Sequence, residues 1–211
     1  MARKRNVETE ARIALAATEL FGTQGYVDTT MVGIAQAAGV AVQTLYLRHG
    51  SKAAILSAAL DVAIAGDTEA ESIMVRGWFA AALDEPDAAA ALSTFTQGVR
   101  SICDRTHRLY EVIRSAAADP EVAEVLEKNR RERISGIRTL TEAFAAKPGF
   151  DPAVPVERAA DLLYALGTED SYLLFVVDRG WTADAWEQWV FTTLAEQVLV
   201  PTRSASGRRR P

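Results

Sequence analysis

The 211-residue chain has little of the chemistry that disulfide-linked or zinc-binding domains use. It contains one cysteine, Cys103, and two histidines, His49 and His107. A single cysteine excludes an internal disulfide framework, and these three residues do not form the spaced set that a structural zinc site needs. We therefore expect no metal site, no cofactor and a reducing environment.

Long apolar runs are also missing. The N-terminal stretch "MARKRNVETEARIALAATEL" is interrupted by Glu8, Glu10 and Arg12, which breaks the apolar segment of a signal peptide. No 18 apolar residues run together, as a membrane-crossing helix would require. Because 49% of the residues are apolar, the chain can still bury a sizeable core. The sequence therefore predicts a soluble, cytoplasmic protein with no membrane partner.

The formal net charge of −5 is distributed unevenly. Residues 1–60 carry a net charge of +2, whereas residues 61–201 carry −11, and four arginines follow Pro201. A basic end could meet a polyanion that the acidic remainder would repel. Ordinary surface chemistry explains +2 over sixty residues equally well, so charge alone does not establish nucleic-acid binding.

Apolar spacing and capping residues predict helices throughout, and no alternating stretch indicates a strand. The first 66 residues fit four helices. These are 7–24, which ends at Gly25; 31–39, which Thr29 or Thr30 caps; 40–48; and 52–66, which Ser51 caps.

The rest of the chain is also predicted to be helical. The helix over 119–144 should be the longest, because Asp119 caps it and Pro120 occupies its first position. The tail 202–211 has no large apolar residue and is predicted to be disordered. The other predicted helices are 84–102, 108–118, 156–166, a segment that continues after a break at Gly167–Thr168, and 183–200, which Thr182 caps.

The second and third predicted helices have the spacing of a helix-turn-helix. Two short helices that meet at a tight turn need a small residue at their contact and a glycine where the chain reverses. Ala35 and Gly39 stand in that order, four residues apart. The third helix would then be exposed to a major groove. The apolar wedge that holds the pair against the first helix would consist of Ile34, Val40 and Leu45.

The stretch "AATELFGTQGYVDTTMVGIAQAAGVAVQTLYLRHGSKAAIL" resembles the N-terminal DNA-binding domain of the TetR family of bacterial transcriptional regulators. The resemblance covers about residues 9–60. It implies an all-α dimer with a three-helix DNA-binding domain at 1–50 and a connecting helix from residue 51. A larger helical domain, 51–201, would bind a small-molecule ligand and a second copy of the chain.

By that resemblance, the "VQTLY" helix reads double-stranded operator DNA. Tyr46 and Lys52 would contact phosphates, while Gln43, Thr44 and Arg48 would lie nearest the base edges. His49 stands where the family usually has an apolar residue, so it either covers the core or has a functional role, as a pH sensor or as a phosphate contact. Leu47 is predicted to pack, and Met31 and Val32 replace two usual phosphate contacts. The candidate DNA contacts are Thr30, Val42, Gln43, Thr44, Tyr46, Arg48, His49 and Lys52.

Apolar and aromatic residues crowd more than one helical face of the region 156–200. Such helices need a partner beyond their own core, which predicts a dimer interface of four helices across a two-fold axis. The alternative is burial inside one subunit. The predicted interface residues are Leu162, Leu166, Tyr172, Phe175, Trp186, Trp189, Val190 and Leu194.

Mixed residues of the kind that line ligand pockets lie between positions 78 and 164. Arg105 or Arg114 would bind a carboxylate ligand, although core packing or surface pairing accounts for each candidate singly. The predicted pocket residues are Trp78, Phe95, Ile102, Arg105, Tyr110, Ile113, Arg114 and Tyr164.

No nucleophile–base pair, metal set or phosphate-binding glycine loop is visible, so we do not expect an enzyme. The leading hypothesis is a homodimeric repressor that a small-molecule effector releases from a palindromic operator. The alternative is a non-enzymatic helical scaffold that binds another protein. A scaffold would explain the aromatic C-terminal region but not the ordered N-terminal motif.

Overall fold

The computed structural model describes residues 2–66 and 77–201 and is all-helical apart from an isolated bridge between Phe150 and Leu199 in that part of the chain. The prediction of an all-α fold is confirmed. The elements are α1 (Ala2–Asp28), α2 (Met31–Ala38), α3 (Val42–His49), α4 (Lys52–Ala65), α5 (Gly77–Asp84), α6 (Ala88–Ser115), α7 (Pro120–Ala145), α8 (Val156–Leu166), α9 (Glu169–Tyr172), the π-helix η2 (Leu173–Asp178) and α10 (Ala183–Val198).

Helix α1 is kinked at Gly25, where the first helix was predicted to end. Gly25 has φ 75° and ψ 177°, a conformation that a residue with a Cβ rarely adopts. One further turn runs to Asp28. The hydroxyl of the buried Thr29 donates to the Gly25 carbonyl at 2.7 Å, so Thr29 stabilises the kink while Thr30 caps α2.

Helix α6 corrects two sequence predictions. The segments 84–102 and 108–118 were expected to form separate helices, but they belong to one helix of 28 residues. Val99, Cys103, Thr106 and Tyr110 are all buried at helical spacing, so a continuous inner face holds the helix together across its charged middle. With 28 residues α6 is also longer than α7, which has 26, so the prediction that 119–144 is the longest helix is wrong.

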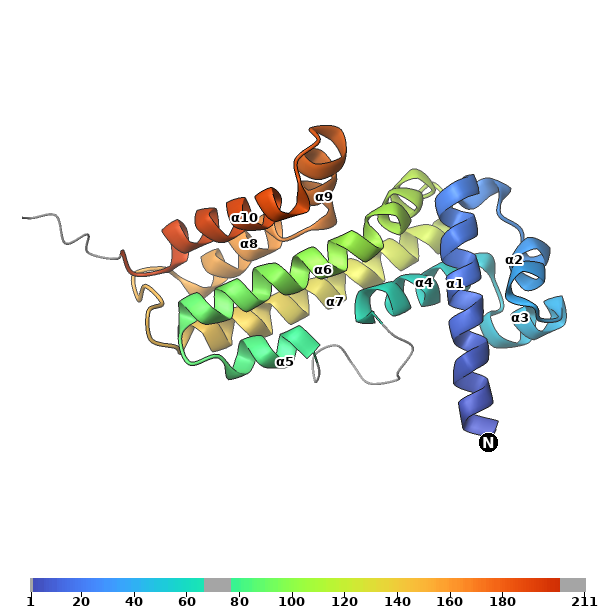
Figure 1. Cartoon of the computed structure of the whole chain (residues 1–211), viewed down its shortest axis with the longest axis horizontal. Coiled ribbons are helices and arrows are strands. Elements are labelled where there is room, and N and C mark those ends of the chain that lie inside the picture. Colours follow the sequence, from blue (N-terminus) through green and yellow to red (C-terminus); the bar gives the residue numbers. More distant parts are fainter. Residues whose placement is uncertain (1, 67–76, 202–211) are drawn as a thin grey trace, which may run out of the picture.

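The two long helices α6 and α7 lie side by side along the long axis of the molecule (Figure 1). Helix α5 covers one flank, and α8 and α10 cover the other, with α9 near the end at which α10 begins. The helices α1 to α3 stand at one end of this bundle.

The buried side chains form two clusters. The first surrounds Phe21, Ile34 and Leu45, and it continues through α4 to Ile113 of α6 and Val122 of α7. The second fills the distant part of the bundle. Helix α1 packs on α6, and α4 packs on both α6 and α7, so the core is continuous across the predicted domain boundary at residue 50.

The predicted disordered tail, 202–211, lies outside the described residues. Within residues 2–66 and 77–201, no helix combines the length and apolar character that a bilayer crossing requires.

Candidate nucleic-acid interface

The turn between α2 and α3 has the geometry that its sequence predicted. Thr30 caps α2, its side chain accepting from the Gly33 N–H at 3.0 Å. Gly39 is left-handed, with φ 64° and ψ 40°, and the next N–H, of Val40, donates to the Ala35 carbonyl at 3.0 Å. A residue with a Cβ would be strained at Gly39. The turn therefore fixes the angle between α2 and α3.

The wedge beneath this turn is confirmed for two of its three residues. Ile34 and Leu45 are fully buried against α1, whereas Val40 is half-buried at the edge of the same cluster. Helix α3 consequently turns one face to the core and the other to solvent.

The outer face of α3 exposes Gln43, Tyr46 and Leu47. Leu47 is 87% exposed, so the prediction that it packs in the core is wrong. Because helical residues advance by 100°, Leu47 marks the outward centre of α3, with Gln43 and Thr44 beside it. Thr44 and Val42 are half-buried and lie in the first turns of the helix. This small face, with one amide, one hydroxyl, one phenol and one isobutyl group, is suited to base edges and thymine methyls.

Lys52 was predicted to contact phosphate, but its ammonium group is engaged inside the domain. Nζ donates to the carbonyl oxygens of Tyr26, Val27 and Thr29 at 2.6, 3.3 and 2.9 Å and lies 4.2 Å from the centre of the Tyr26 ring. Burial lowers the pKa of Lys52, against an opposing effect of Asp119 and Asp28. Lys52 therefore joins the start of α4 to the end of α1.

We expect Lys52→Met to lower the free energy of unfolding by about 1–3 kcal/mol, because three carbonyls lose their donor. The measurement is urea unfolding followed by circular dichroism. The control is Lys128→Met, because the ammonium group of Lys128 contacts Asp61 at the surface. Unchanged stability together with weaker DNA binding would restore Lys52 as a phosphate contact.

Arg48 and His49, at the end of α3, both meet Glu10 of α1. Arg48 Nη1 is paired with Glu10 Oε1, and His49 Nε2 lies 3.1 Å from Glu10 Oε2. The His49 side chain is only 11% exposed, which agrees with the interpretation that it covers the core. Nothing in the sequence signals Glu10, because it precedes Arg48 by 38 residues.

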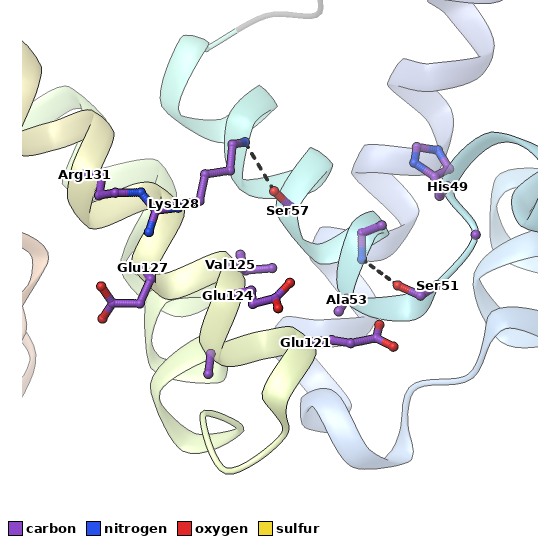
Figure 2. A pocket seen from close by; sticks show the side chains of 13 residues that line it. His49, Ser51, Ala53, Ser57, Glu121, Glu124, Val125, Glu127, Lys128 and Arg131 are labelled. Carbon is purple, nitrogen blue, oxygen red and sulfur yellow. Dashed lines mark hydrogen bonds between the residues drawn. The ribbon is translucent and has the colours of Figure 1, made fainter.

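An open groove of about 960 Å³ lies beside this region, between α4 and α7. Figure 2 shows Glu121 and Glu124 on its α7 side, and Lys128 reaching Ser57 of α4. The lining holds both signs of charge. None of the predicted pocket residues contributes to this groove.

The structure separates the predicted pocket residues. Ile113 belongs to the first buried cluster, around Phe21. Phe95 belongs to the second cluster, where the centres of the Phe95 and Trp78 rings are 6.1 Å apart. Arg105 donates to the carbonyls of Ala63 and Ile64 at the end of α4, and Arg114 pairs with Asp170 at 2.5 Å. Ile102 is half-buried.

Tyr110 and Tyr164 do come together, around a residue that the sequence did not indicate. The guanidinium of Arg133 lies 5.7 Å from the Tyr110 ring centre and 5.5 Å from that of Tyr164, and it is paired with the buried Glu169. Thr106 donates to the second oxygen of Glu169 at 3.2 Å. Burial alone would lower the pKa of Arg133, but Glu169 and Tyr110 raise it on balance.

Four of the eight predicted interface residues are buried within the chain itself. Tyr172 is 4% exposed, and Trp186, Val190 and Leu194 are at most 1% exposed. All four belong to a buried core cluster of the chain itself, which is what the alternative of burial inside one subunit predicts. The other four predicted interface residues are half-buried and therefore still accessible to a partner. They are Leu162, Leu166, Phe175 and Trp189.

Comparison with known families identifies the N-terminal helices. Residues 13–59 match the sequence model of a family described as bacterial regulatory proteins, tetR family. No curated protein matches the sequence.

Solved structures share the fold over most of their length. NalD, the secondary repressor of the MexAB-OprM multidrug efflux pump in Pseudomonas aeruginosa, superposes with a TM-score of 0.65 at 20% identity, covering 90% of this chain and 96% of its own. A TetR family transcription regulator from Marinobacter aquaeolei gives 0.63 at 16%, covering 94% and 100%. FadR from Bacillus subtilis, in complex with stearoyl-CoA, gives 0.67 at 16%, covering 89% and 98%.

Proposed function

We propose that this chain is a DNA-binding transcriptional regulator of the tetR family, and specifically a homodimeric repressor which a small-molecule ligand releases from a palindromic operator. The observation that carries the proposal is the outer face of α3. Gln43, Tyr46 and Leu47 are exposed on a helix whose angle the Gly39 turn fixes. A rigidly held helix with polar and apolar groups on one face suits a major groove.

Repression and ligand release are supported by two of the similar structures. NalD is a repressor, and FadR binds stearoyl-CoA. In this chain α4 connects the two regions, because it begins at Ser51 beside α3 and ends under the Arg105 side chain of α6. A ligand that shifts α6 would move α4 and change the spacing of the two α3 helices. A coupling of roughly 1–3 kcal/mol is typical of such regulation.

A dimer fits this proposal, because helix-turn-helix dimers read two half-sites about one helical turn, ~34–36 Å, apart. The accessible residues of the predicted interface, Leu162, Leu166, Phe175 and Trp189, lie on α8, η2 and α10. Leu174 and Trp181 are exposed nearby, at 52% and 38%. Apolar side chains in this number favour a second copy of the chain as the partner.

The test is selection of duplexes from a random DNA pool by the purified protein, followed by affinity measurements across a salt series. We expect a palindrome, and an affinity that falls steeply with salt because phosphate contacts release counterions. Selection of no sequence above background would contradict the proposal and favour the scaffold alternative.

Two substitutions distinguish contacts with phosphates from contacts with base edges. We expect Tyr46→Ala to weaken binding to the operator and to random DNA alike, whereas Gln43→Ala should remove about 1–3 kcal/mol of discrimination at one base position. The control is Gln197→Ala, the corresponding change at an exposed position of α10. Equal losses on both DNAs for Gln43→Ala and Tyr46→Ala would refute the assignment of Gln43 to a base edge.

A further inference from the structure

Glu10 is an acidic side chain directed at the end of the recognition helix from a different helix. It lies on α1, and its two oxygens meet Arg48 and His49, which are consecutive residues of α3. The Glu10 side chain is 39% exposed and that of His49 is 11% exposed, so the contact runs from the domain surface to its interior.

The position of Arg48 on α3 explains why this contact matters. Arg48 follows Leu47, the outward centre of the helix, by 100° and therefore lies on the flank that faces α1. From this flank a long guanidinium side chain can stay on Glu10 or swing toward a phosphate. Exposed ion pairs contribute about 0–1 kcal/mol, so the two alternatives are close enough in free energy to compete.

We propose that Glu10 is a positioning residue that sets DNA specificity, by keeping Arg48 on α1 and holding α3 at the angle that operator recognition needs. On random DNA, where contacts with phosphates supply essentially all of the affinity, Glu10 withholds the Arg48 charge. On the operator, Arg48 stays on Glu10 and the contacts of Gln43 with base edges are retained. The inference rests on the proposed DNA-binding function and assigns Arg48 to helix positioning rather than to base reading.

The experiment compares the full-length wild-type protein with Glu10→Gln, Arg48→Met and the double variant. Affinities for the selected operator and for a random duplex of equal length are measured over a salt series. Glu8→Gln is the matched control, because it removes the same charge from an exposed position of α1 two residues away. Thermal unfolding of each variant checks that the domain is folded.

For Glu10→Gln we expect about threefold to fivefold tighter binding to random DNA, the size of one exposed ion pair. The salt slope on random DNA should become steeper by about 0.9 for each additional phosphate contact. The operator should gain less than random DNA, because α3 loses the contact that holds its angle, so the ratio of operator to random affinity should fall. In the Arg48→Met background, Glu10→Gln should change random-DNA binding no more than Glu8→Gln does.

Two outcomes would overturn the inference. Equal effects of Glu8→Gln and Glu10→Gln would show that only net charge matters, and an undiminished effect in the Arg48→Met background would show that Glu10 does not act through Arg48. Failure of the proposed function is distinguishable, because the wild-type protein itself would then select no operator.

Discussion

Replacing Glu169 by Leu is expected to lower the free energy of unfolding by about 3–5 kcal/mol, a large part of the stability of an ordinary domain. Glu169 is 4% exposed and pairs with Arg133, whose guanidinium lies between the rings of Tyr110 and Tyr164. Without the carboxylate, a buried positive charge has no counter-charge. The cost is the desolvation of that charge rather than the strength of the lost contact.

The double variant Arg133→Met/Glu169→Leu separates these two contributions. Two apolar side chains of similar volume need no ionic partner, so most of the lost stability should return. Asp170→Asn is the control, because it changes the neighbouring acid, which is 52% exposed, and should cost at most about 1 kcal/mol. Urea unfolding gives the free energy of unfolding of the Glu169→Leu, double-variant and Asp170→Asn proteins. A Glu169→Leu protein as stable as the wild type would show that the Arg133 charge is solvated without its partner.

Adding one methyl group at Gly98 is expected to be the next most damaging change. A Cβ built on Gly98 would lie 2.1 Å from Cδ2 of the Trp78 ring, far inside van der Waals contact. Trp78 would have to leave the surface of α6 and its edge contact with Phe95. Overpacking of this kind costs about 1–3 kcal/mol, so Gly98→Ala should lower the urea midpoint clearly.

The same substitution at Gly136 provides a matched control on a neighbouring helix. There a Cβ would meet Phe79 at 3.7 Å, an ordinary contact, and alanine is the better helix former by about 1 kcal/mol. Gly136→Ala should therefore stabilise the protein slightly. In a Trp78→Ala background the penalty for Gly98→Ala should disappear, and its persistence would mean that the clash is not with the Trp78 ring.

Features that depend on neighbouring residues were predictable from the sequence. Thr30, Ser51, Asp119 and Thr182 cap the helices they were expected to cap, because a capping side chain bonds to an N–H two or three residues away. Gly39 adopts the left-handed turn for an equally local reason. These local signals are sufficient to define the helix-turn-helix without any tertiary contact.

Predictions about partners across the fold were less successful. The sequence predicted separate helices over 84–102 and 108–118, yet the buried Cys103 and Thr106 lie inside one continuous helix. Trp186 and Val190 were predicted to lie in a dimer interface. Apolar periodicity shows that a helical face is buried, but it does not show whether the same chain or a second copy buries it. In the structure that cover is supplied by the same chain.

The sequence by itself determined the all-helical class, the caps at Thr30, Ser51, Asp119 and Thr182, the turn of the DNA-binding motif and the resemblance that these carry. Only the tertiary structure decided what Lys52, Arg48 and Arg133 do. Their partners lie 23–26, 38 and 36 residues away along the chain. A charged side chain on a predicted helix has the same local pattern whether it meets phosphate, a carbonyl or a carboxylate. The choice among these depends on which backbone or side chain the packing of distant helices brings within reach.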